Sequence, residues 1–163
     1  MTNDDKRKAF DLVVWTSSVL FACALVAHEA LAKDKSFAVT DQVYKAECGS
    51  CHVAYPPALL SARSWQAVLS GLDRHFGTDA SVDAKSLAAL RAFLDSNAGR
   101  DRRASAGTPG LRISETDWFR REHRKVPATT WQGAAVKSPA NCAACHTGAE
   151  RGDYSERGIR VPN

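Results

Sequence analysis

Apolar residues spaced three and four positions apart predict a mostly α chain with irregular connections. The clearest stripe predicts a helix over 64–76, with Ser64 as its N-cap. A second stripe predicts a helix over 82–96, with Ser81 as its N-cap. A shorter helix is expected over 44–52. No run of alternating apolar and polar residues predicts a strand, so the expected fold class is mostly α.

The first thirty-two residues have the pattern of a secretory leader. A charged start is followed by an apolar run over 12–27 and then by the sequence A-L-A, which signal peptidase cuts after. The apolar run is shorter than the roughly 20 residues that a membrane-spanning helix needs. A loose lipid-attachment sequence ends at Cys23, but Phe21 is unfavourable in it. We therefore expect export to the periplasm, with a signal peptide over 1–32 that is cleaved between Ala32 and Lys33.

The motif C-x-x-C-H occurs twice, at 48–52 and at 142–146. Without the leader, the two copies contain all four cysteines and two of the four histidines of the chain. A disulfide framework is typical of exported chains with an even number of cysteines, but it leaves the two histidines unexplained. A zinc ribbon places its two knuckles roughly 15–20 residues apart, far closer than these copies lie. A thioredoxin-type dithiol needs one motif in a βαβ unit, which the pattern does not predict.

Covalent attachment of haem accounts for each position of the motif. Residues three apart on a helical turn lie on one face, roughly 5–6 Å apart, so two thiols can add to the two vinyl groups on one edge of a porphyrin. The histidine that follows is then held under the iron. We predict two covalently attached c-type haems. The predicted attachment residues are Cys48, Cys51, Cys142 and Cys145, and the predicted proximal ligands of iron are His52 and His146.

The second axial ligand of each iron is predicted from the residues that remain. The mature chain has no methionine, which excludes the His/Met site of high-potential cytochromes. His75 and His123 are the two spare histidines, and each lies 23 residues from a motif histidine. Alternatively, His75 is a core residue bonded to a carbonyl and His123 belongs to a solvated basic helix face. Two irons that each need a ligand favour ligation by both, but the spacing does not say which histidine serves which haem.

A segment without apolar periodicity, 100–110, contains three Arg, two Gly and one Pro. Such composition is typical of a linker. We therefore predict an N-terminal haem domain over 33–99 and a C-terminal haem domain over 111–163. Each predicted domain contains one C-x-x-C-H copy and one spare histidine.

The charge of the chain is only mildly positive. The formal net charge is +4, and removal of the leader leaves 19 Lys and Arg against 14 Asp and Glu, or +5. No nucleic-acid-binding motif accompanies this charge, so we expect no nucleic-acid partner. A modest positive charge favours encounter with an acidic partner, at a rate that falls as salt rises.

The sequence around both motifs resembles the bacterial periplasmic dihaem cytochrome c family. The resemblance rests on E-C-G-S-C-H-x-x-Y-P-P over 47–57, S-W at 64–65, H-F-G over 75–77, W-F-x-x-E-H over 118–123, N-C-A-A-C-H-x-G-A-E over 141–150 and G-D-Y over 152–154. It implies two small helical cytochrome c-like haem domains, bis-histidine haems, and His75 and His123 as the distal ligands. It also implies a small monohaem oxygen-binding cytochrome as the electron acceptor and a membrane cytochrome b as the donor.

The function expected is one-electron, outer-sphere transfer between a membrane quinol or cytochrome b donor and a soluble haem protein. No substrate needs to reach an iron whose axial positions are both filled, so we expect an electron-transfer protein and not an enzyme. The alternative is a small haem enzyme, a peroxidase or an oxygen-binding catalyst, in which one distal histidine leaves the iron. A redox-sensing interaction subunit is a third hypothesis.

Overall fold

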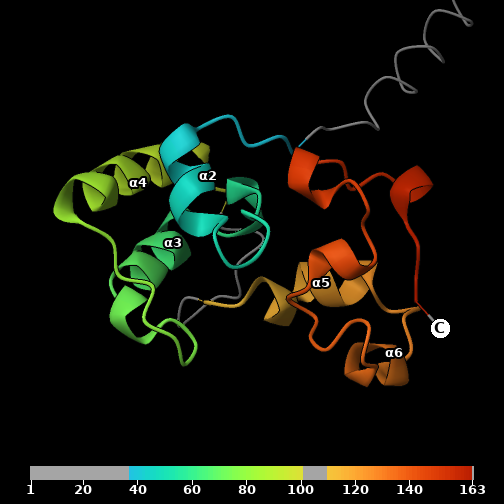
Figure 1. The fold of residues 1–163 in the computed structure, drawn as a ribbon. Helices are drawn as coiled ribbons and strands as arrows, with labels where there is room; N and C mark the ends of the chain where they lie inside the picture. The colour runs from blue at the N-terminus through green and yellow to red at the C-terminus, as the bar shows by residue number, and fades with distance from the viewer. Residues whose placement is uncertain (1–36, 101–109, 163) are drawn as a thin grey trace, which may run out of the picture. The chain divides into compact units, whose positions relative to one another are not determined.

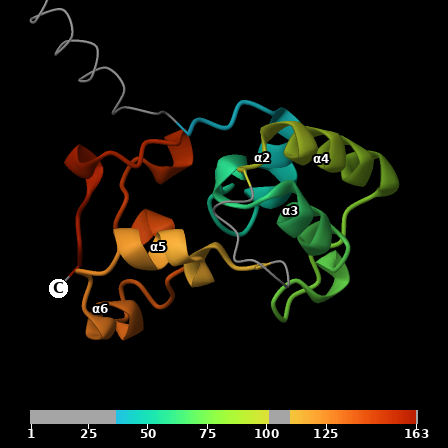
Figure 2. The same cartoon turned by 180° about the vertical axis from the view of Figure 1, so that it is seen from behind.

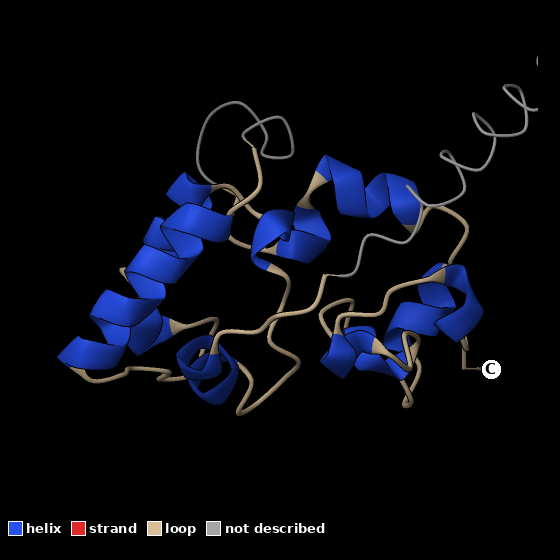
Figure 3. Ribbon diagram, turned by 90° about the horizontal axis from the view of Figure 1, so that it is seen from above, coloured by secondary structure: helices blue, strands red, loops and turns tan. Residues whose placement is uncertain are grey.

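The computed structural model describes residues 37–100 and 110–162, which are helical with irregular connections (Figure 1; Figure 3). The α-helices are α2 (Gln42–Cys48), α3 (Ala62–Leu69), α4 (Ala84–Asn97), α5 (Asp117–Glu122) and α6 (Ala128–Gln132). Short 3-10 helices cover Pro57–Leu59, Leu72–Arg74, Ile113–Glu115, Cys142–Ala144, Ala149–Arg151 and Glu156–Gly158. The described residues form isolated β-bridges but no strand, so the prediction of a mostly α fold is confirmed.

Several sequence predictions fall wholly or partly on residues outside this description. The predicted signal peptide lies outside the described residues, and so does most of the predicted linker. Within 37–100 and 110–162, no helix is both long and apolar enough to cross a membrane. The described residues on both sides of the linker belong to one compact unit, so the division into two haem domains stays a prediction.

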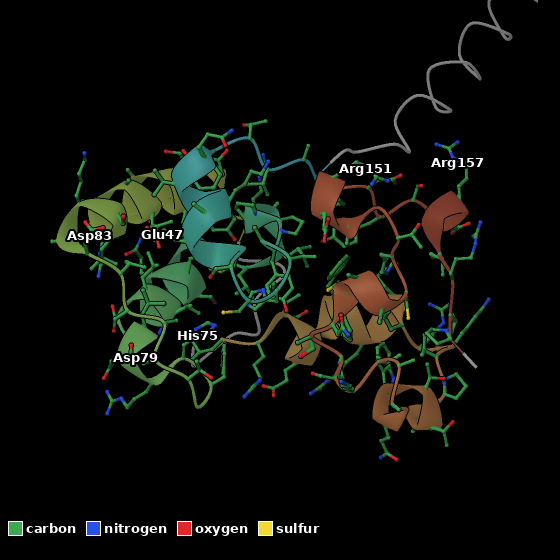
Figure 4. The ribbon with its side chains drawn as sticks, in the orientation of Figure 1. Glu47, His75, Asp79, Asp83, Arg151 and Arg157 are labelled. Atoms are coloured by element: carbon green, nitrogen blue, oxygen red, sulfur yellow. The ribbon has the colours of Figure 1, made fainter. Side chains whose placement is uncertain are left out.

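Helices α2, α3 and α4 pack together around the core of the N-terminal half, 37–100 (Figure 1; Figure 2). Buried side chains of this core are Tyr44, Leu60, Trp65, Leu69, Leu90 and Leu94. The Trp65 indole Nε1 donates a 2.7 Å hydrogen bond to the Pro57 carbonyl. Figure 4 shows Glu47 on α2, and its Oε1 accepts a 2.9 Å bond from Ser86 Oγ of α4. These contacts fix the end of α2, where the first C-x-x-C-H motif begins.

Helix α3 begins and ends earlier than the apolar stripe predicted. Its N-cap is Ser61, not Ser64, and the Ser61 side chain accepts from the Ser64 amide. The helix ends at Leu69 because a 3-10 turn follows it and redirects the chain. Beyond that turn Phe76 has φ 51° and Gly77 has φ 100°, both in the left-handed region. The predicted helix over 64–76 is therefore wrong in its last two turns, and His75 lies in a tight turn.

Helix α4 begins two residues later than predicted. Asp83 is its N-cap and accepts from the amides of Lys85 and Ser86, whereas Ser81 lies outside the helix. A carboxylate that accepts two helix amides is a better cap than a hydroxyl two residues upstream, because it satisfies two donors that have no helical partner. After α4 the Gly99 amide donates to the Leu60 carbonyl at 2.8 Å. A Cβ at Gly99 would collide with the Ala58 carbonyl oxygen, so this close return requires glycine.

The C-terminal half, 110–162, has a smaller core. Its buried hydrophobic residues are Phe119, Val136 and Ala149. Helix α5 is capped by Thr116, whose side chain accepts from the Phe119 amide. The rest of this half is mostly 3-10 turns that are held by backbone hydrogen bonds. A core with so few buried side chains removes little apolar surface from water.

Candidate functional site

The first C-x-x-C-H motif begins at the last residue of α2. Asp41 caps this helix and Gly49 closes it, with the Gly49 amide bonded to the Lys45 carbonyl. A Cβ at Gly49 would collide with the Lys45 carbonyl oxygen, so glycine permits the sharp exit after Cys48. Cys51 and His52 lie in the turn that follows, and both are exposed. The helix predicted over 44–52 is therefore wrong after Cys48, because the chain turns there.

The second motif lies on a 3-10 turn, Cys142–Ala144. The His146 amide donates to the Cys142 carbonyl at 2.8 Å, which makes the motif one compact loop. The Arg160 amide donates to the Cys145 carbonyl at 2.8 Å, so the end of the chain lies against this loop. Both motifs thus bring two thiols and a histidine together in a turn, although only the first begins on an α-helix.

The four predicted iron ligands lie in two pairs. The ring centres of His52 and His75 are 6.4 Å apart, and those of His123 and His146 are 6.1 Å apart. An imidazole nitrogen binds a first-row metal at about 2 Å, and the ring centre lies roughly 1.1 Å behind it, so two imidazoles on one iron have ring centres about 6.2 Å apart. Both pairs therefore have the separation that one shared iron requires.

Hydrogen bonds orient two of these imidazoles. His52 Nδ1 lies 2.8 Å from the Val53 carbonyl, and His123 Nδ1 lies 2.9 Å from the Phe119 carbonyl. A carbonyl oxygen only accepts, so each Nδ1 must carry the proton and each Nε2 keeps its lone pair. This tautomer is the one that binds a metal through Nε2, with the second nitrogen held by a backbone carbonyl.

The other two imidazoles, those of His75 and His146, are partly buried. Burial, then the neighbouring His52 and Arg112, lowers the pKa of His75. Burial and the neighbouring His123 lower the pKa of His146, against an opposing effect of Asp153. The Nδ1 atom of His146 is buried and has no hydrogen-bond partner. Lowered pKa values favour the neutral ring, which is the form that binds a metal.

Both motifs line one cavity of about 660 Å³. Its walls include Cys51 and His52 from the first motif and Cys142 from the second. Tyr55 also lines it, stacks on the His52 ring at 4.5 Å and 16°, and donates from its hydroxyl to the Ala140 carbonyl at 2.6 Å. The volume lies within the range of cofactor pockets, about 300–1,000 Å³. The cavity therefore has room for part of a large cofactor between the two motifs.

The alternatives to haem find no support in these residues. The four motif cysteines are free, so they form no disulfide in the structure. Burial raises the pKa of Cys48 and of Cys142 to about 11 each, so both thiols are protonated at neutral pH. Within the described parts of the chain, no three His, Cys, Asp or Glu side chains are grouped as a metal site.

Two features of the site were not predicted from the sequence. The structure pairs His52 with His75 and His123 with His146. These are the histidines that lie 23 residues apart, but the spacing alone does not assign either pair to one iron. The role of Tyr55 was also missed. Its position three residues after His52, just before two prolines, was the available signal, because prolines fix the direction of the chain after the motif.

The chain is similar to known dihaem cytochromes over most of its length. The family described as "Dihaem cytochrome c" matches residues 44–154. A dihaem cytochrome c from Rhodobacter sphaeroides is 44% identical, with 76% of this chain and 98% of that chain covered and a TM-score of 0.63. A second structure of the protein purified from this organism is 48% identical, covers 72% of this chain and 99% of its own, and has a TM-score of 0.63.

A third structure comes from another organism. The new dihaem cytochrome type c from Shewanella baltica OS155 is 35% identical, with 75% of this chain and 93% of that chain covered and a TM-score of 0.66. Among curated proteins, none matches the chain. The family match covers more than half of the chain, and the structural matches extend over nearly the whole of each relative. The chain therefore belongs to the dihaem cytochrome c family and has two covalently bound c-type haems.

Proposed function

We propose that this dihaem cytochrome is a periplasmic electron carrier in which two histidines bind each iron. His52 and His75 would bind one iron, and His123 and His146 would bind the other. Electrons would come from a membrane quinol or cytochrome b donor and leave to a soluble monohaem cytochrome that binds oxygen. Membership of the family supports electron transfer, and the predicted leader supports the periplasm.

The pairing of the four imidazoles supports this proposal most strongly. Ring centres 6.4 Å and 6.1 Å apart suit two nitrogens on one metal and leave no room there for a substrate. A haem with two imidazole ligands supplies an iron that takes up and gives back one electron without a change of ligands. The residues of the chain then have two tasks, which are to hold both imidazoles in place and to exclude water.

The hydrogen bonds and ring contacts of the structure perform the first task. The Val53 and Phe119 carbonyls fix the tautomers of His52 and His123. Phe119 also stacks on His123 at 4.0 Å and 22°, and Trp131 meets the same ring edge to face at 5.7 Å. A ligand that is held by its neighbours does not need to move when the charge of the site changes, which favours fast electron transfer.

Replacement of one distal ligand tests the proposal. We expect the purified protein to be low-spin at both irons, to lack a Met-to-iron band and to bind carbon monoxide poorly when reduced. His75→Ala and His123→Ala should each keep two covalent haems, because the cysteines are unchanged, while one of the two haems becomes high-spin and binds carbon monoxide. In the double variant both haems should become high-spin and bind carbon monoxide. Each single variant is the control for the other.

Two results would contradict the proposal. An unmodified protein that binds carbon monoxide at one haem would favour the small haem enzyme with a labile histidine. A His123→Ala variant that stays low-spin at both haems would show that another group, such as a lysine amine, completes the second site.

A further inference from the structure

The positive charge of the described chain is concentrated in its C-terminal half. Residues 37–100 contain six Lys and Arg and six Asp and Glu, whereas residues 110–162 contain nine Lys and Arg and six Asp and Glu. Figure 4 shows two of these cations, Arg151 and Arg157, on the C-terminal half. The N-terminal half is therefore formally neutral, and the C-terminal half has an excess of three positive charges.

Four cations of this half flank one predicted iron ligand. They are Arg120, Arg121, Arg124 and Lys125, which we call the α5 basic surface, and all four are exposed. Glu122 is the one acidic residue among them, so the surface has a formal charge of +3. His123 lies in the middle of this sequence and is only partly exposed.

Among the described residues, these four cations form no ion pair with a carboxylate. The ion pairs found among residues 37–100 and 110–162 are Arg74 with Asp73 and Arg112 with Glu115, and neither involves the α5 basic surface. Arg124 donates to the Arg121 carbonyl at 3.2 Å and helps to close α5. Cations in the last turn stabilise a helix through its dipole, but this effect does not require four cations around one histidine.

Two aromatic side chains contact the imidazole of His123. Phe119 stacks on His123, and Trp131 contacts both rings at 5.9 Å and 5.7 Å. His123 itself is paired with His146 of the second motif. A protein that docks on the α5 basic surface would thus contact residues that are next to His123 in the sequence. Exposed positive charge around a redox centre attracts a partner with a negative face and raises its rate of encounter.

We propose that the α5 basic surface is the docking site for the acidic face of a redox protein, so that electrons leave the chain beside His123 from the second haem. The proposal rests on the electron-carrier function above and adds to it the place of contact, the charge of the partner and the haem nearest to it.

Two small oxidants of opposite charge test the surface without a known partner. The reduced holoprotein is mixed in stopped flow with the trianion hexacyanoferrate(III) or with the trication tris(phenanthroline)cobalt(III), at low and at high salt. The test variant is Arg120→Gln with Arg121→Gln. The matched control is Arg63→Gln with Lys85→Gln, which removes the same formal charge from exposed positions of the N-terminal half.

We expect the test variant to slow oxidation by the anion about tenfold at roughly 0.01 M ionic strength, where the Debye length is about 30 Å, and by less than about twofold at 1 M, where it is about 3 Å. Oxidation by the cation should become faster in the same variant. The control should change either rate by less than about twofold. Melting temperatures and spectra should match those of the unmodified protein, which separates docking from helix stability.

Other results would overturn the proposal. Equal changes in test and control variants would mean that total charge and not this surface sets the rate, and a test variant without change would mean that electrons leave elsewhere. Sedimentation with vesicles of anionic phospholipid, lost in the test variant, would assign the surface to a membrane instead. A reduced protein that neither oxidant reoxidises would defeat the carrier function itself, whereas the preceding results leave that function intact.

Discussion

Replacement of Tyr55 by phenylalanine removes one hydrogen bond between the two halves of the chain. The Tyr55 hydroxyl donates to the Ala140 carbonyl at 2.6 Å, and Ala140 lies two residues before Cys142. Burial raises the pKa of Tyr55 to about 12, so the phenol stays protonated and remains a donor throughout the neutral range. Phenylalanine keeps the ring that stacks on His52. The variant therefore tests the hydroxyl alone.

The expected loss follows from the environment of this bond. A neutral hydrogen bond contributes about 0.5–1.5 kcal/mol to stability, and the partly buried Ala140 carbonyl would lose one donor while it keeps its 3.1 Å bond from the Cys142 amide. We expect Tyr55→Phe to lower the free energy of unfolding by about 1 kcal/mol. For a chain of this length that corresponds to a fall of about 3–5 °C in melting temperature. Far-UV circular dichroism during heating or denaturant unfolding measures both quantities.

A second tyrosine provides a matched control for Tyr55. The Tyr44 hydroxyl donates to the Tyr55 carbonyl, also at 2.6 Å, but this bond lies within the N-terminal half. Tyr44→Phe should cost a similar amount and speed amide hydrogen exchange in α2, α3 and α4. Tyr55→Phe should speed exchange around 138–142 instead, because its bond ends there. A Tyr55→Phe protein with an unchanged melting temperature and unchanged exchange at 138–142 would refute this reasoning.

Two further predictions concern α5 and the leader. Thr116→Ala should lower the free energy of unfolding by about 1–2 kcal/mol, because Thr116 caps α5 through the Phe119 amide. Thr116→Ser should keep most of that stability, because serine retains the hydroxyl. Equal melting temperatures for the alanine variant and the unmodified protein would count against the cap. Protein purified from the periplasm should begin at Lys33, as read by mass spectrometry, whereas retained residues 1–32 would contradict cleavage and a lipid on Cys23 would support the lipoprotein alternative.

The residues of the site could be predicted because few residue types can attach a haem or bind its iron. Beyond the predicted leader the cysteines are Cys48, Cys51, Cys142 and Cys145, and the absence of methionine from this part of the chain leaves histidine as the obvious sixth ligand. Haem attachment by these four cysteines and iron binding by the individual histidines stay predictions, although the family and its two haems are confirmed. The pairing of the histidines needed the fold, because sequence spacing alone does not say which turns face each other.

The helix boundaries were predicted less well, for a local reason. Ser61 and Ser64 both have the chemistry of an N-cap, and the structure places the cap at Ser61, whose side chain accepts from the Ser64 amide. The end of α3 was missed because the apolar stripe continues to Phe76, although the backbone leaves the helix after Leu69. Tertiary contacts thus overrode a periodic pattern. The chain needs His75 in a turn to face His52, which a continued helix would prevent.

The unequal cores of the two halves affect how the protein matures. Seven of the ten buried hydrophobic residues belong to 37–100, and three belong to 110–162. A half with so few buried side chains gains little from folding before its cofactor is attached. We therefore expect the N-terminal half to become compact first when the chain folds. The second C-x-x-C-H would then remain an open peptide, accessible to the haem-attachment machinery until its own haem completes the core.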